Sequence, residues 1–118
     1  MAGKLTTHVL DTARGVPAAG MGYRLYRVSG TSHRKIAHGV TNATGRTDVP
    51  LLAGRAMRVG SYELIFAAGA YLRSSGQAGK GVLFLDQVPI RFGIADAEAH
   101  YHVPLLLSPF GYATYRGS

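Results

Sequence analysis

The sequence predicts an all-β sandwich with one short helix, and two observations lead to this. Hydrophobic and polar residues alternate along several short segments, and stretches rich in glycine and proline separate these segments. The alternation stops at 68–74, the one segment that suits a helix. With 118 residues the chain can bury one hydrophobic core, so we expect a single domain over residues 1–118.

The first predicted strand covers residues 5–11 and has two different faces, because neighbouring side chains of a strand point to opposite sides of the sheet. Leu5 and Val9 share the face that we expect to pack into the core. His8 then lies on the opposite face, beside Leu10. The remaining strands are predicted at residues 21–28, 34–41, 61–67, 88–94 and 100–107.

Two of these strands carry further expectations. Ile36, His38 and Val40 alternate with polar or small residues, which predicts a single apolar face on the strand at 34–41. Pro89 lacks a backbone N–H, so we expect its strand to begin near the edge of a sheet.

Residues 100–118 (HYHVPLLLSPFGYATYRGS) combine a strand with an unusual polar end. Tyr101 and Val103 fall on the predicted core face, and His102 falls on the other face beside Leu106. A histidine among apolar neighbours suits a face that a second protein surface covers. Chain ends commonly fray, but this one carries tyrosine and arginine almost to its last residue, so we expect the tail to be docked.

The composition excludes several classes of protein. No cysteine is present, which removes disulfides, thiolate nucleophiles and thiolate metal ligands. The formal net charge is +7, but Lys and Arg are scattered singly, so we expect a basic surface that attracts small anions and no nucleic-acid partner. No leader pattern and no apolar run long enough to span a bilayer stands out, so we expect a soluble, cytoplasmic protein without a membrane partner.

A turn in the middle of the chain presents an arginine. Residues 41–48 (TNATGRTD) are dense in turn formers, and we expect Gly45 to supply the positive φ that lets Arg46 project from the bend. An arginine held in this way is a planar donor for carbonyl or carboxylate oxygens. The alternative is an exposed loop arginine without a role.

Without cysteine, the available catalytic groups are histidine, serine, tyrosine, arginine and the carboxylates. One neutral imidazole can take a proton from water while a second donates one to a leaving nitrogen, and His8 and His102 could form that pair. Zinc bound by His8, His100 and His102 is the alternative. No carboxylate is obviously placed to orient these rings, so we expect no metal. No nucleophile elbow and no phosphate-binding loop occurs in the sequence.

Three segments together resemble one known family from end to end. They are LTTHVLDTARGVPAAG at 5–20, TNATGRTD at 41–48 and HYHVPLLLSPFGYATYRGS at 100–118. The family is that of the 5-hydroxyisourate hydrolases, also called transthyretin-like or transthyretin-related proteins. The terminal YRGS, residues 115–118, separates these hydrolases from the transthyretins proper.

The resemblance implies a transthyretin-type fold of two four-stranded sheets with one short helix, assembled as a homotetramer that is a dimer of dimers. A channel would run through its centre, with active sites where the dimers meet. The resemblance also implies a set of site residues. Those matched as catalytic are His8, Arg46 and His102, and those matched as substrate-binding are His8, Arg46, Tyr115, Arg116, Gly117 and Ser118.

The implied reaction is the hydrolytic ring opening of 5-hydroxyisourate to 2-oxo-4-hydroxy-4-carboxy-5-ureidoimidazoline in urate catabolism, without a cofactor. One histidine would activate water while the other protonates the departing nitrogen, and which of them does which stays open. Arg46 would stabilise the developing oxyanion, and Tyr115 would orient the planar ring. The alternative is a transthyretin-like carrier that binds a small ligand in the same channel without turning it over.

Overall fold

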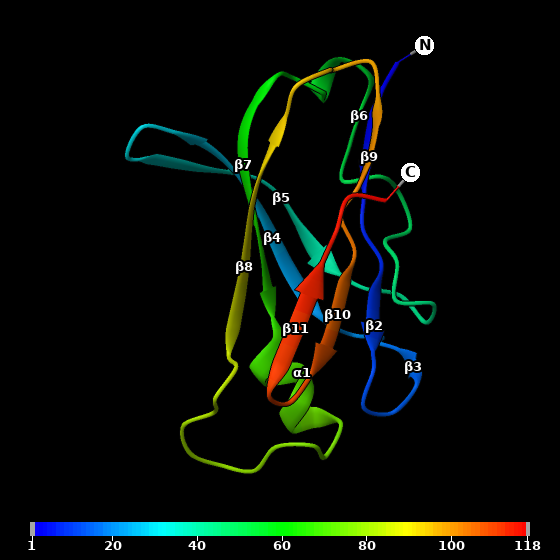
Figure 1. Cartoon of the computed structure of the whole chain (residues 1–118), viewed down its shortest axis with the longest axis vertical. Coiled ribbons are helices and arrows are strands. Elements are labelled where there is room, and N and C mark those ends of the chain that lie inside the picture. Colours follow the sequence, from blue (N-terminus) through cyan, green and yellow to red (C-terminus); the bar gives the residue numbers. More distant parts are fainter. Residues whose placement is uncertain (1, 118) are drawn as a thin grey trace.

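The computed structural model describes residues 2–117, and these residues fold as the predicted all-β sandwich (Figure 1). Within this range there are eleven short strands, one α-helix and one 3-10 helix, η1 (Gly54–Ala56). The α-helix, α1, spans Ala68–Ser74, as the sequence predicts. No helix in the described part of the chain is long and apolar enough to cross a membrane.

One layer is an antiparallel sheet with the strand order β5-β4-β7-β8. Its strands are β4 (Gly22–Ser29), β5 (Ser32–Val40), β7 (Gly60–Ala67) and β8 (Gln87–Ile94). The strand that contains Pro89 lies at the edge of this sheet, which confirms the expectation from proline. Long antiparallel pairing along β4, β7 and β8 makes this layer the continuous one of the two.

The other layer is interrupted into two hydrogen-bonded sets, β6-β1-β9 and β11-β10-β2-β3. Its strands are β1 (Lys4–Thr6), β2 (Val9–Asp11), β3 (Val16–Pro17), β6 (Leu52–Ala53), β9 (His100–His102), β10 (Leu105–Ser108) and β11 (Gly111–Thr114). The strands predicted at 5–11 and 100–107 are each broken once, which adds two strands to the six that the alternation predicts. The other three, β3, β6 and β11, lie outside the predicted strands.

The two broken strands still run parallel and side by side through their breaks. Backbone hydrogen bonds join Val103 N–H to the Thr6 carbonyl at 2.9 Å and Leu105 N–H to the His8 carbonyl at 3.0 Å. The break does disturb the predicted alternation, because Pro104 is buried although the sequence places it on the outward face. The segments 5–11 and 100–107 are therefore direct neighbours in the fold.

The core lies between the two layers and under α1. It contains the predicted inward residues of both layers, among them Leu5, Val9, Tyr62, Leu64, Phe66, Val88, Ile90, Tyr101, Leu105 and Leu107. Full burial of one large apolar side chain contributes about 1.5–3 kcal/mol to folding. The many leucine, valine and aromatic side chains at inward strand positions therefore hold the two layers together.

The apolar face predicted for the strand at 34–41 is wrong. Val40 is 62% exposed and His38 is exposed, while Ile36 is only partly buried. This segment forms the edge strand β5, and its pairing with β4 skips Ile36, since Leu25 pairs with Ala37 and Tyr26 with Lys35. A bulge of this kind breaks the strict alternation of faces, so an edge strand with alternating hydrophobic residues need not bury them.

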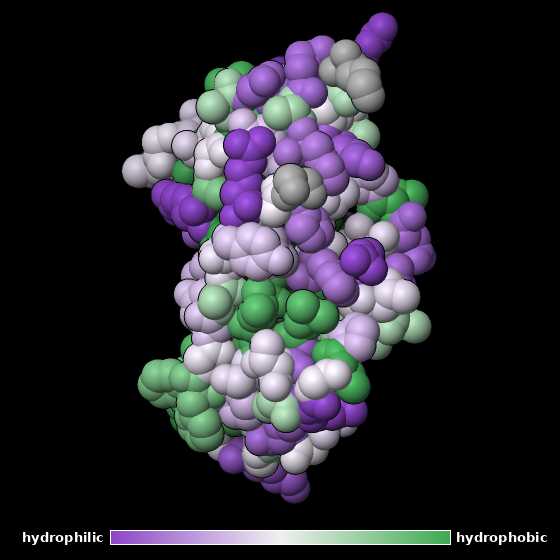
Figure 2. Space-filling model, turned by 45° about the vertical axis from the view of Figure 1, so that its right-hand side comes forward, coloured by the Kyte–Doolittle hydropathy of each residue, from purple (hydrophilic) through white to green (hydrophobic). Residues whose placement is uncertain are grey.

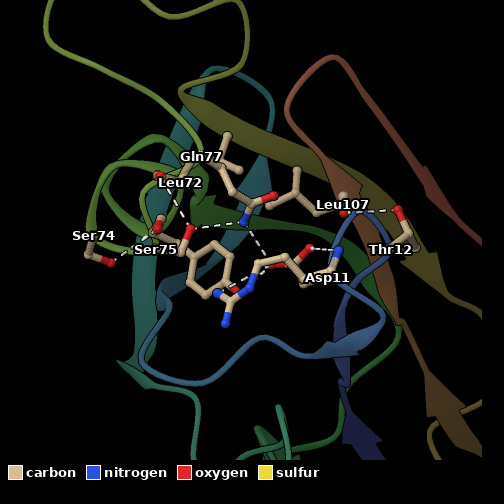
Figure 3. A network of polar contacts seen from close by, with 9 residues as sticks. Asp11, Thr12, Leu72, Ser74, Ser75, Gln77 and Leu107 are labelled. Atoms are coloured by element: carbon tan, nitrogen blue, oxygen red, sulfur yellow. Dashed lines mark hydrogen bonds and ion pairs between the residues drawn. The ribbon is translucent and has the colours of Figure 1, made fainter.

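A buried carboxylate ties the end of β2 to the segment around α1 (Figure 3). Asp11 accepts hydrogen bonds from the Tyr71 hydroxyl at 2.6 Å, from Gln77 Nε2 at 2.8 Å and from the backbone N–H of Arg14 at 3.0 Å. Burial acts to raise the pKa of Asp11, but these hydrogen bonds outweigh it and hold the pKa below its ordinary value. Burial and the nearby Asp11 raise the pKa of Tyr71 to about 12.

We expect the substitution Asp11→Asn to lower the free energy of unfolding by about 3 kcal/mol, because three donors lose a charged acceptor. A depressed carboxyl pKa stabilises the fold above the ordinary value of 3.8, and this stabilisation disappears as the pH falls through the lowered pKa. Urea unfolding should therefore show a wide gap between wild type and variant at pH 7 that narrows below pH 3.8. The matched control is Glu98→Gln, which removes an exposed carboxylate; an equal loss in both variants would contradict a role for the buried network.

Candidate active site

Three polar side chains meet on the outward face of the paired strands β1 and β9. Thr6 and His102 are partners in the parallel register, and His100 lies two residues before His102 on the same face. The Thr6 hydroxyl oxygen is 2.8 Å from Nε2 of His100 and 2.8 Å from Nδ1 of His102. The two imidazole rings are edge-on to each other, with their centroids 6.3 Å apart. One hydroxyl therefore connects both histidines.

Arg46 projects from the turn that the sequence predicts. Gly45 has a φ of 77°, and a Cβ atom built there would collide with the carbonyl oxygen of Val9. The side chain of Asn42 accepts a hydrogen bond from the backbone N–H of Arg46 at 3.2 Å, which holds the bend from inside. The turn docks on the strand break, where His8 and Arg46 form an isolated β-bridge.

A cleft of about 370 Å³ lies between these two features. Thr6, His100 and His102 line one side of it. Arg46 and the loop 47–50 line the other side. The cleft is thus lined by a guanidinium, two imidazoles, a carboxylate and threonine hydroxyls, and imidazole and guanidinium groups can assist a reaction at a carbonyl carbon.

A second cleft, of about 730 Å³, adjoins the first along the two histidines. His100 and His102 line both clefts, and the second is completed by Ala99 and the tail residues Tyr115, Arg116 and Gly117. Its position beside β9 follows from the path of the chain, since the segment after β11 returns towards β9 (Figure 1).

The tail is docked as far as Gly117, as expected. The backbone N–H of Gly117 donates to the carbonyl of His102 at 2.8 Å. The Arg116 guanidinium lies over the ring of Tyr101 at 4.0 Å, and its Nη2 donates to the His100 carbonyl at 3.4 Å. Tyr115 is 58% exposed. Ser118, the last residue of the set expected to bind substrate, lies outside the described residues.

The surroundings of His102 favour its neutral form. Burial lowers the pKa of His102, and the nearby His100, His8 and Arg46 lower it further, because each adds positive charge or the capacity for it. A histidine with a lowered pKa is unprotonated near pH 7 and can therefore accept a proton.

His8 lies close to Arg46 but lines neither of the two clefts. Its Nε2–H donates to the Thr44 carbonyl at 2.9 Å, which points the ring at the 41–48 turn. Within residues 2–117, no group of three or more His, Cys, Asp or Glu side chains is arranged to hold a metal ion. The structure thus brings Arg46, His102 and the tail together around two adjoining clefts and leaves His8 at their margin.

Sequence reasoning missed two parts of this site. Thr6 shares the outward face with His8, but its contact with His100 and His102 depends on the parallel pairing of β1 with β9, which no local pattern predicts. The loop 47–50 forms a wall of the first cleft and carries no catalytic residue type that would single it out, apart from Asp48. Thr6 could have been identified from the sequence only if the segment 5–11 had been assumed to pair in parallel with the segment 100–107.

A model of the HIUase/Transthyretin family matches residues 5–117 of this chain. A 5-hydroxyisourate hydrolase of Mesorhizobium japonicum is 60% identical over 116 residues, which cover 98% of this chain and 93% of that protein. The match thus includes both clefts and the described part of the tail.

Two solved structures agree with the family match. The 5-hydroxyisourate hydrolase of Klebsiella pneumoniae has a TM-score of 0.80 and 36% identity, and covers 98% of this chain and 99% of its own. An (S)-allantoin synthase has a TM-score of 0.93 and 46% identity over 99% of this chain, which spans only 44% of that longer chain. These likenesses confirm the transthyretin-type sandwich that the sequence motifs imply. With a family model matched over residues 5–117, this chain belongs to the HIUase/Transthyretin family.

Proposed function

We propose that the protein is a hydrolase that opens the ring of 5-hydroxyisourate in urate catabolism. The observation that carries this proposal is the pairing, in one cleft, of an imidazole kept neutral by its surroundings with an arginine. The name of the relative from Mesorhizobium japonicum, which matches over 98% of this chain, supports the same substrate.

The proposed chemistry needs only side chains of this chain. His102 takes a proton from water, whose oxygen attacks the ring carbonyl carbon and forms a new C–O bond. The Arg46 guanidinium donates to the oxygen on which negative charge develops. The C–N bond then breaks, and a proton passes to the departing nitrogen, so that water is divided between a carboxyl group and an N–H group. His8, at the margin of the cleft, is the proposed donor of that proton in its doubly protonated form, because its Nε2–H is held by the Thr44 carbonyl. The proton that His102 took from water then returns to His8, so both histidines end the cycle as they began.

We place the part of the substrate ring that lies away from the reacting carbonyl in the second cleft. Tyr115, Arg116 and Gly117 line it together with His102, so a planar ring placed there would reach the base from the tail side. Arg116 is held over Tyr101 and can present its remaining N–H donors to ring carbonyls. Ser118 continues this segment and stays a predicted substrate contact.

We also propose the tetrameric assembly, a dimer of dimers. Phe84 is 74% exposed and Phe110 is 79% exposed, and their rings lie 6.1 Å apart. The largest hydrophobic areas of the face in Figure 2 lie in its lower half, and an apolar surface of this kind suits contact with another protomer. The single domain over residues 1–118 and the cytoplasmic location stay predictions.

The direct test is the ultraviolet decay of freshly generated 5-hydroxyisourate with and without the protein. We expect the protein at micromolar concentration to shorten the lifetime of the substrate markedly, and chelator treatment to leave this effect unchanged. Decay at the same rate with and without protein would contradict the proposed function. Size-exclusion chromatography with light scattering tests the tetramer separately.

A further inference from the structure

The hydrogen bonds that join Thr6 to His100 and His102 restrict which nitrogen of each imidazole ring carries the proton. A threonine hydroxyl has one hydrogen to donate, and it accepts through its lone pairs. Both of its ring partners are nitrogens at 2.8 Å. If both rings donated to the two lone pairs, the Thr6 hydrogen would have no partner among residues 2–117. The arrangement that also uses this hydrogen has one nitrogen that carries a proton and donates to Thr6, while the other is bare and accepts from Thr6. The tautomers of the two rings are therefore coupled in opposite senses.

Two tautomer pairs satisfy this condition. They differ in whether Nε2 of His102, the ring nitrogen that does not contact Thr6, carries a proton. If Nδ1 of His102 carries the proton, its Nε2 is a bare lone pair, and the ring is a base. If Nδ1 accepts from Thr6, Nε2 carries the proton and the ring can only donate. Among residues 2–117, the structure gives Nε2 of His102 no hydrogen-bond partner that would decide between the two.

The charges around His102 favour one of these pairs. Arg46 and Asp48 both line the cleft, but the charged or chargeable neighbours that shift the pKa of His102 are His100, His8 and Arg46, and all three lower it. A positive neighbour disfavours a ring N–H that faces it and favours a bare lone pair there. Packing fixes the orientation of the His102 ring. Its Cδ2 side lies against Gly117, so the ring cannot turn over freely and exchange the places of its two nitrogens. The tautomer with the bare Nε2 fits this environment better.

We propose that Thr6 and His100 are positioning residues that fix the tautomer of His102, with Nδ1–H of His102 donating to Thr6 and the Thr6 hydroxyl donating to Nε2 of His100. This inference rests on the proposed function, because it assigns the state of the base in that reaction. When His102 takes a proton at Nε2, its Nδ1–H bond to Thr6 becomes a hydrogen bond from a cation and strengthens. This hydrogen bond therefore stabilises the transition state more than the ground state, and its loss should lower kcat more than it changes KM.

The test compares two substitutions at one position. Thr6→Val keeps the shape and the strand preference but removes the hydroxyl, and Thr6→Ser keeps the hydroxyl. We expect Thr6→Val to lower kcat about 10- to 100-fold, as loss of a hydrogen bond to a charged group does, with little change in KM. Thr6→Ser should retain most of the activity. Equal kcat values for the two variants would overturn the proposal.

The pH profile gives a readout that mere loosening of the strand would not move. The Thr6 oxygen stabilises protonated His102 more than the neutral ring, so its removal should lower the pKa of His102 further. The acid limb of kcat/KM against pH should then shift to lower pH in Thr6→Val and return in Thr6→Ser. An unshifted limb together with a reduced rate would assign Thr6 a structural role and contradict the proposal.

A spectroscopic measurement separates this inference from the proposed function. Long-range 1H–15N spectra of the whole protein with labelled histidine report the tautomer of each neutral ring without substrate. We expect His102 to be protonated at Nδ1 in the wild type, and to shift towards protonation at Nε2 in His100→Leu, where the freed Thr6 hydrogen can turn to His102. Protonation at Nε2 in the wild type would overturn the tautomer assignment even if 5-hydroxyisourate is hydrolysed. A wild type with the expected tautomer but no hydrolysis would instead contradict the proposed function alone.

Discussion

Replacement of His102 by alanine is expected to slow 5-hydroxyisourate hydrolysis by about 100- to 10,000-fold, the range that a positioned general base contributes. The imidazole lines both clefts, and its lowered pKa keeps it ready to accept a proton near pH 7. The side chain is only partly buried, so its removal leaves the core intact. The measurement is kcat/KM from the ultraviolet decay of the substrate, with circular dichroism as the check on folding.

The matched control for this prediction is His38→Ala. His38 is an exposed histidine on the edge strand β5, and it lines neither of the two clefts. Its removal should change kcat/KM by less than a factor of two, because no proposed step uses it. A comparable loss in both variants would show that the effect at His102 reflects a general loss of histidine or of folding, and it would remove His102 from the mechanism.

The second large effect is expected for Gly117→Ala in the tail. A Cβ atom at this position would lie 2.7 Å from Cδ2 of His102 and 3.2 Å from its Cβ, so either the ring or the tail must move. Misplacement of a catalytic group by about 1 Å can cost about 100-fold in rate. We therefore expect kcat to fall by about that factor, although no reacting atom has been removed.

Gly79→Ala is the control for the added methyl group. Gly79 is exposed, and a Cβ atom there would meet nothing within 4 Å. This variant should keep the activity of the wild type. The ring resonances of His102 should shift in Gly117→Ala and stay in place in Gly79→Ala. Full activity of Gly117→Ala would mean that the tail does not hold His102 in its working position.

Local patterns in the sequence were sufficient for most elements of the fold. Alternation placed the inward residues of β7 and β8, and the loss of alternation placed α1. It failed at β5, an edge strand with an unpaired extra residue at Ile36, where Val40 lies in solvent. It also failed to foresee the breaks in the first and final strands, because a break depends on which backbone groups find partners across the sheet.

The candidate site was predictable only in part, for a similar reason. Gly45 and Arg46 could be read from turn chemistry, and the outward position of His102 could be read from alternation. That these residues share a cleft depends on contacts between segments about forty to one hundred residues apart, which no local rule supplies. The same applies to Thr6, whose importance lies in its distance to two rings on another strand.

The most direct measurement is a side-by-side decay trace of 5-hydroxyisourate with the wild-type protein, with the His102→Ala variant and with buffer alone. If the cleft between Arg46 and His102 is where water attacks the ring, the wild-type trace falls fastest and the variant trace lies close to that of buffer. If wild type and variant accelerate the decay equally, hydrolysis takes place elsewhere on the molecule, and the proposed site is wrong.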